Sequence, residues 1–138
     1  MRASVYKTLT EDPAVLDALD GQPNIFPNYS MDTVPAGDQP FVILRFGNQE
    51  VAKGITRGPR VLQVWAHMPR AVDNDFGVID RILLACDNAL TAMTHVPGAD
   101  GYTVTSCRKT GEGADYYDEG YKTIARSNEY MILSRLSQ

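Results

Sequence analysis

The sequence predicts an α+β fold: a four-stranded, mainly antiparallel sheet with one long helix packed across a face and a short N-terminal helical segment. Residues 41–46 are apolar almost without interruption, which is typical of a strand covered on both faces. Between residues 79 and 93, apolar side chains recur three and four positions apart, as on one helix face. The patterns follow the order helix, strand, strand, helix, strand, strand, and the 138 residues suit a single domain, 1–138.

The N-terminal region is expected to be helical. Its apolar residues have the spacing of one face of a short helix, at Ala3, Val5, Tyr6 and Leu9. Asp12 followed by Pro13 predicts a second helix start, because a carboxylate caps free N–H groups and proline suits the first helical position. The second apolar stripe ends at Gly21. Residues 22–39, with three prolines and Gly37 among Asn and Asp residues, are predicted to form an extended connector or loop.

Two strands and a helix are expected in the middle of the chain. Residues 41–46 and 60–68 are predicted to pair as an antiparallel hairpin with a long loop, and Trp65 is expected in the core. Pro69 ends the second strand. A helix then begins after the capping oxygens of residues 73–75 and ends before Pro97.

The last third of the chain predicts two strands separated by a loop. Residues 101–110 are rich in β-branched side chains, and residues 122–134 alternate in polarity. The acidic and aromatic run 112–120 is flanked by glycines and has neither period, so a loop is expected there.

Composition and charge exclude several classes of function. The formal net charge is -4, which argues against a domain that wraps nucleic acid or lies on an anionic membrane. The N-terminus has no apolar signal-peptide core, and Arg45 and Arg81 interrupt the longest apolar stretches. Neither an export signal nor a membrane span is therefore predicted.

The sequence holds few groups with catalytic or metal-binding spacing. Cys86 and Cys107 are expected to be reduced thiols, and His67 and His95 lack HxxxH, HExxH or CxxC spacing. No metal, cofactor or catalytic residue is predicted. A small enzyme that uses Cys107 with His67 stays open as the less favoured alternative.

Two loops of opposite charge are the candidate subunit contacts. One is basic, with Lys53, Arg57 and Arg60, and the other is acidic and aromatic, with Asp115, Tyr116, Tyr117, Asp118 and Glu119. Each alone is typical of a solvated loop. Together they suggest a head-to-tail contact between copies of the chain, in which the basic loop of one subunit meets the acidic loop of the next.

The chain resembles the tail terminator (tail completion) proteins of long-tailed bacteriophages over nearly its whole length. The resemblance is carried by short motifs, namely NIFP at 24–27, QPFVILR at 39–45, LQVWA at 62–66, VIDRILLA at 78–85 and YMIL at 130–133. The run at 60–65 and the Asp115–Tyr116 loop are most similar to members from actinobacteriophages.

The resemblance implies a structural virion protein without catalytic activity. Its members would form a homo-hexameric ring on the last ring of the major tail tube protein, stop tube polymerisation and present their other face to a head–tail connector or adaptor protein. The tape measure protein is a further candidate partner, and genomic DNA would pass through the lumen without specific binding. The implied location is the head–tail junction of the virion, the neck of a siphovirus, with the host cytoplasm before assembly. Another neck component, a connector or adaptor, is the structural alternative.

Overall fold

Two short helices begin the chain in the computed structural model, which describes residues 1–27, 38–49 and 59–137. They are α1 (Arg2–Glu11) and α2 (Pro13–Ala18), and Asp12 lies between them. The Oδ1 atom of Asp12 accepts hydrogen bonds from the backbone N–H groups of Ala14 and Val15, at 2.9 and 3.1 Å. The helix start predicted at Asp12 and Pro13 is therefore confirmed, because this carboxylate satisfies two N–H groups that the first turn leaves unpaired.

The third helix, α3 (Phe76–Thr91), forms where the apolar stripe predicts one. The side chain of Asp75 accepts a hydrogen bond from the backbone N–H of Gly77 at 2.9 Å and so caps the first turn. The stripe turns inward and is buried at Ile79, Ile82, Leu83, Cys86 and Leu90. Burial of this face holds α3 against the sheet.

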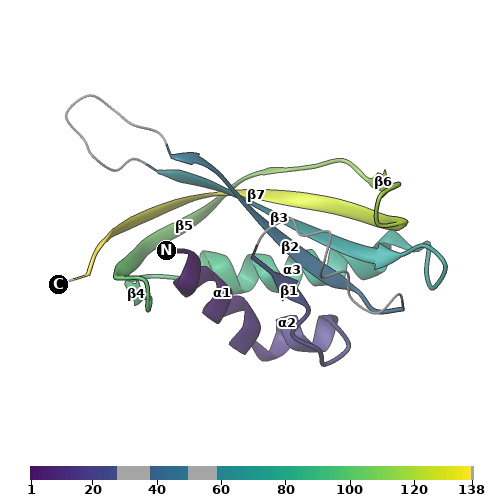
Figure 1. Ribbon diagram of the computed structural model, residues 1–138, viewed down its shortest axis with the longest axis horizontal. Coiled ribbons are helices and arrows are strands. Elements are labelled where there is room, and N and C mark those ends of the chain that lie inside the picture. The colour runs from purple at the N-terminus through teal and green to yellow at the C-terminus, as the bar shows by residue number, and fades with distance from the viewer. Residues whose placement is uncertain (28–37, 50–58, 138) are drawn as a thin grey trace.

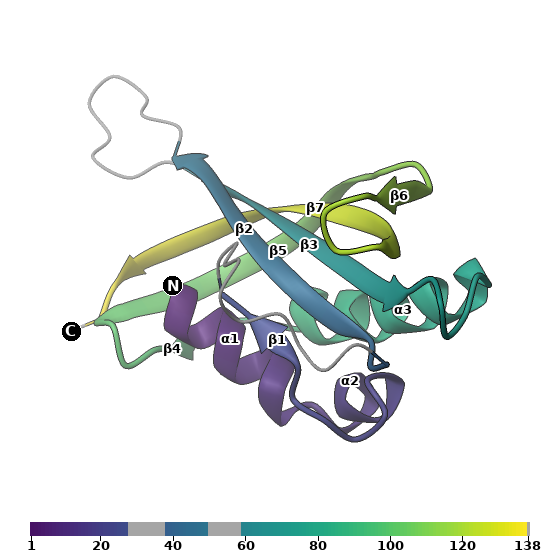
Figure 2. The same ribbon diagram turned by 45° about the vertical axis from the view of Figure 1, so that its right-hand side comes forward.

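In the described part of the chain, seven strands form one strongly twisted sheet, and the helices lie together on one of its faces (Figures 1 and 2). The strands are β1 (Ile25–Phe26), β2 (Phe41–Gln49), β3 (Arg60–Pro69), β4 (Val96–Pro97), β5 (Tyr102–Glu112), β6 (Tyr116–Asp118) and β7 (Thr123–Leu136). The order across the sheet is β1-β2-β3-β7-β5-β4, and β6 also pairs with β7. The β1–β2 pair is parallel and the other pairs are antiparallel.

The fold class predicted from the sequence is wrong. The sheet has seven strands instead of four and is mixed, because β1 pairs parallel with β2. In place of one long helix and a short segment, three short helices of 10, 6 and 16 residues share one face of the sheet. The antiparallel pairing of β2 with β3 agrees with the predicted hairpin.

The missed strands lie in segments expected to be loops. Ile25 and Phe26 follow Pro23, yet they pair with Val42 and Ile43 because β2 offers a free edge there. Tyr116 to Asp118 pair with the first residues of β7 in the same way. Partner strands supply the hydrogen bonds for both segments, so neither needs a periodic pattern of its own. β4 is a third short edge strand, and it pairs with β5 through Val96 and Pro97.

The core lies between the helices and one face of the sheet. Along β7 the helix-facing side chains Ile124, Tyr130 and Ile132 are buried, whereas Met131 and Leu133 on the other face are partly or largely exposed. We call this second face the open face, because no helix of the described residues covers it (Figure 2). Within the described residues, no helix has both the length and the apolar character needed to cross a membrane.

Candidate functional site

A cleft on the open face is built from residues of several strands. It has a volume of about 170 Å³ and is lined by Ile43, Arg45, Trp65, His67, Tyr116, Asp118 and Tyr121. Ile43 and Trp65 are paired across β2 and β3, and His67 lies two residues further along β3. The floor of the cleft is therefore apolar and aromatic, with Arg45 and Asp118 as the charged groups of its lining.

Aromatic rings hold the floor of the cleft together. The ring of Phe41 stacks on the imidazole of His67, with ring centroids 4.7 Å apart. Tyr121 meets the same two rings edge-on, at centroid distances of 5.5 Å from Phe41 and 5.3 Å from His67. Tyr116 meets Trp65 edge-on at 6.2 Å. Such edge-to-face contacts are favourable, so the cleft has a defined shape before any partner binds.

His67 is buried in this floor as a neutral imidazole. Its Nδ1 atom lies 2.8 Å from Oγ1 of Thr123, and its side chain is 3% exposed. Burial lowers the pKa of His67 to about 4, although the nearby carboxylate of Asp118 acts in the opposite direction. The imidazole is therefore uncharged at neutral pH and serves as a packing element.

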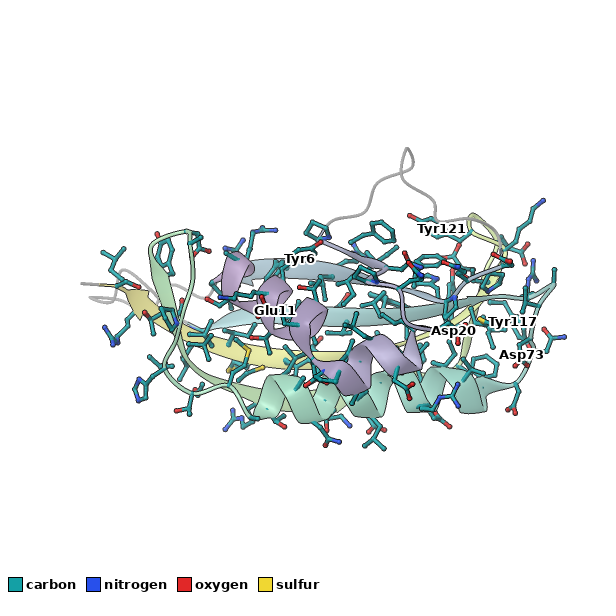
Figure 3. All side chains as sticks on the ribbon, turned by 90° about the horizontal axis from the view of Figure 1, so that it is seen from below. Tyr6, Glu11, Asp20, Asp73, Tyr117 and Tyr121 are labelled. Carbon is teal, nitrogen blue, oxygen red and sulfur yellow. The ribbon has the colours of Figure 1, made fainter. Side chains whose placement is uncertain are left out.

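β6 places its two tyrosines on opposite faces of the sheet. Tyr116 covers Trp65 on the open face, whereas Tyr117 packs edge-on against Phe76 at the start of α3, with centroids 6.1 Å apart. Both tyrosines remain about half exposed. Figure 3 shows Tyr117 and Tyr121 at one end of the molecule, together with Asp73. The predicted contact residues Tyr116 and Tyr117 thus offer aromatic surface at that end.

The three predicted carboxylates of this region each have a partner within the chain. Asp115 accepts a hydrogen bond from Arg126 at 3.2 Å, and Arg126 also pairs with Asp80 on α3. Asp118 accepts a hydrogen bond from the backbone N–H of Tyr121 at 2.9 Å. Glu119, which is largely exposed, lies 3.6 Å from Arg70. We call Asp115, Asp118 and Glu119 the acidic end.

Arg60, the predicted basic residue that falls within the described part of the chain, lies at the other end of the sheet. Nε of Arg60 donates to the backbone carbonyl of Gly47 at 3.1 Å, and Arg2 from α1 lies over the ring of Phe46 at 4.5 Å. Burial and the neighbouring charge of Arg60 lower the pKa of Arg2. We call Arg2, Arg60 and the exposed Arg135 near the end of β7 the basic end. Lys53 and Arg57 lie outside the described residues.

The strand register separates the two ends within one chain. Arg60 pairs with Ile132, and Asp118 pairs with Thr123, so the two residues lie nine positions apart along β7. Nine residues of extended chain span roughly 30 Å. Arg60 therefore cannot contact Asp118 of its own subunit, and a contact between these two residues requires a second molecule.

The structure does not bring Cys107 and His67 together. Cys107 pairs with Ile132 and packs in the core on the helix side, whereas His67 pairs with Ala125 and lines the cleft on the open face. Burial raises the pKa values of Cys86 and Cys107 to about 12, so both thiols are protonated at neutral pH. In the part of the chain that the structure describes, His, Cys, Asp and Glu side chains do not gather in threes as metal ligands would.

The cleft itself was not identified from the sequence. Trp65 was expected in the core but is half-buried on the open face, Arg45 was not singled out as a candidate, and His67 was considered only as a partner of Cys107. The alternation along residues 60–68 indicates this face, because Gln63, Trp65 and His67 lie on the same side of the strand. A strand covered on both faces rarely carries such polar side chains. Those three side chains mark a face that no helix covers.

The comparisons with known proteins concern the fold. Over 96% of its length, the chain matches a chain of the virion of a native gene transfer agent (GTA) particle, of which the match covers 92%, with a TM-score of 0.67 and 15% sequence identity. No protein-family model matches the sequence. A search of curated protein sequences gives no match either. The fold is therefore shared with a component of a phage-like particle.

Proposed function

We propose that this protein is a structural subunit of a phage-like virion and that, within it, the protein is the tail terminator. Six copies form a ring on the last ring of the tail tube, stop its polymerisation and join the tail to the head connector. The observation that carries the proposal is the fold, shared over nearly the full length of both chains with a component of a gene transfer agent virion. The resemblance of the sequence to tail terminator proteins supports the tail-capping role within the particle.

The two charged ends support assembly as a ring. A closed ring of identical subunits requires two different surfaces that complement each other, because each contact is head-to-tail. The acidic and basic ends are opposite in charge and lie at opposite ends of β7. The formal net charge of -4 also suits a lumen that lets DNA pass without gripping it.

Electron microscopy of particles made without this protein tests the role. We expect tubes that exceed the normal length and carry no heads, and we expect the purified protein to restore the length when it is added during assembly. Tubes of normal length beside unattached, filled heads would instead identify a connector or adaptor, and normal virions would contradict both structural roles.

Charge reversal tests the head-to-tail contact separately. Arg57→Glu with Arg60→Glu is expected to prevent ring formation, and Glu119→Lys in the same chain is expected to restore it in part, as measured by size-exclusion chromatography. Asp115 and Asp118 are left unchanged because they accept hydrogen bonds from Arg126 and from the backbone N–H of Tyr121 within the subunit. If Glu119→Lys gives no rescue, these loops do not meet.

A further inference from the structure

The end of β7 has the features of a segment that pairs with another molecule. Residues 133–136 pair with β5 on one side, but β3 stops at Arg60, opposite Ile132. Within the described residues, no strand pairs with the other side of 133–136. Leu133 and Leu136 are 46% and 55% exposed, and Arg135 between them is also exposed. An exposed strand edge with apolar side chains is a ready template for contact with a second chain.

The pattern of this segment complements the cleft at the other end of the sheet. Side chains two residues apart share one face of a strand, so Leu133 and Arg135 point the same way and Leu136 points the opposite way. The cleft offers an apolar floor of Ile43 and Trp65 with the carboxylate of Asp118 on one side of it, whereas the exposed Arg45 lies on the other side, in the row of Gln63. An apolar side chain and a cation on one strand face thus match the floor and the carboxylate when the cation points away from Arg45.

We propose that the cleft of one subunit receives the β7 end of the next subunit, with Leu133 on the floor formed by Ile43 and Trp65 and the Arg135 guanidinium at Asp118. This inference rests on the proposed ring, and it names the segment that carries the head-to-tail contact.

The geometry of a single chain favours a second copy as the occupant. Trp65 in the cleft floor pairs with Ser127 of β7, and Leu133 lies six residues further along the same strand, so the segment cannot reach the cleft of its own subunit. Figures 1 and 2 show β6 and the C-terminal end of β7 at opposite ends of the twisted sheet. The two surfaces differ, and each subunit carries one of each, which is the arrangement that closes a heterologous ring.

Chemical cross-linking tests which surfaces meet. Glu119→Cys is placed beside the cleft. Ser137→Cys is placed directly after β7, where the Ser137 hydroxyl lies 2.6 Å from Oγ1 of Thr103, the residue that pairs with Arg135. The native thiols of Cys86 and Cys107 are buried and protonated, so they give little background with a short bis-maleimide. We expect a mixture of the two chains, each with one introduced cysteine, to give only the mixed cross-linked dimer. A chain that carries both introduced cysteines should give a series of cross-linked oligomers up to the size of the ring.

Paired substitutions test the side chains in the contact. Leu133→Ser is expected to weaken self-association about tenfold, whereas Leu136→Ser, its matched control on the opposite strand face, is expected to change it little. Arg135→Gln and Asp118→Asn are each expected to weaken it about tenfold, and the double variant no further, because both remove one interaction. Asp118→Asn keeps an oxygen that can accept from the Tyr121 N–H. Arg81→Gln, on the exposed side of α3, is the charge control.

The outcomes separate this contact from the proposed function. Rings that form without the mixed cross-link, or equal effects of Leu133→Ser and Leu136→Ser, would overturn the contact and leave the terminator role standing. A cross-linked ring that fails to limit tube length would support the contact and overturn the terminator role. A protein that stays monomeric at all concentrations would overturn the contact.

Discussion

The ring of Phe41 lies parallel to the imidazole of His67, with the ring centroids 4.7 Å apart and an angle of 1° between the planes. The two residues are paired across β2 and β3, and both are buried on the open face beneath Tyr121. A charged imidazolium in this position would lose most of its hydration. The stack therefore ties the shape of the cleft floor to the protonation state of one histidine.

Stability is expected to fall as the pH decreases from about 6.5 to about 4. The pKa of His67 is about 4 in the folded protein, against 6.5 when unfolded, so the unfolded chain binds a proton first. Above pH 6.5 His67 is neutral in both the folded and the unfolded chain, and the free energy of unfolding does not depend on its titration. By pH 4 the free energy of unfolding is about 3 kcal/mol lower, because the unfolded chain has bound the proton. Urea unfolding at pH 7, 5.5 and 4.5 measures this loss.

The control for this prediction is His67→Asn, which removes the titrating group and keeps a polar atom near Thr123. Carboxylates also titrate below pH 5, so the informative quantity is the difference between the pH profiles of the two proteins. We expect a flatter profile for the variant. Parallel profiles would show that protonation of His67 does not contribute.

The Tyr130 hydroxyl is expected to stabilise the packing of α3 on β7. Tyr130 is fully buried, and its hydroxyl donates a hydrogen bond to Asp87 on α3 at 2.8 Å. Tyr130→Phe removes one buried hydrogen bond to a charged acceptor, which costs about 2 kcal/mol in the free energy of unfolding. Tyr6→Phe, at an exposed position of α1, is the matched control in the same urea titration. Equal midpoints for the two variants would contradict the prediction.

A methyl group at Gly98 is expected to displace the start of α1. A Cβ atom there would lie 2.8 Å from Oδ1 of Asp100 and 3.1 Å from the backbone nitrogen of Ser4, and closer still to the Ser4 hydroxyl. Ser4 is buried, and Asp100 pairs with the terminal ammonium of Met1. Gly98→Ala should therefore lower the free energy of unfolding by about 2 kcal/mol.

The matched control is Gly111→Ala in β5, because a Cβ atom at Gly111 has no heavy atom within 4 Å apart from its chain neighbours. Its substitution should leave the melting temperature almost unchanged. If both variants melt alike, close packing at Gly98 does not fix the position of α1.

The sequence was informative where one element determines its own structure. Asp12 with Pro13, the stripe from Ile79 to Leu90, and the alternation in polarity along β7 are local signals, and each predicted its element. The short edge strands carry no such signal. β1 follows a proline and β6 lies in an acidic run, and both exist because neighbouring strands offer free edges.

The candidate site was likewise predictable from the sequence only in part. The acidic and basic residues were identifiable from charge alone, but their separation along β7 depends on the register of Arg60 with Ile132 and of Asp118 with Thr123. The cleft was not predictable because it needs β2, β3, β6 and the Tyr121 turn in one place. Trp65 was assigned to the core because aromatic residues are usually buried, whereas the helices cover only one of the two faces of its strand.

Arg126 is expected to hold the bend between β5 and β6 against α3. Its guanidinium pairs with Asp80 on α3 and with Asp115 in the bend, and its side chain is 22% exposed. Arg126→Met keeps most of the aliphatic contact and removes both ion pairs, so we expect a loss of about 1 kcal/mol in the free energy of unfolding. The loss should shrink in 1 M salt, because salt screens partly exposed charges.

Amide hydrogen exchange at residues 113–116 should accelerate in Arg126→Met, whereas Arg81→Met on the exposed side of α3 should leave it unchanged. Unchanged exchange in Arg126→Met would mean that the backbone pairing of β6 with β7 alone fixes the bend.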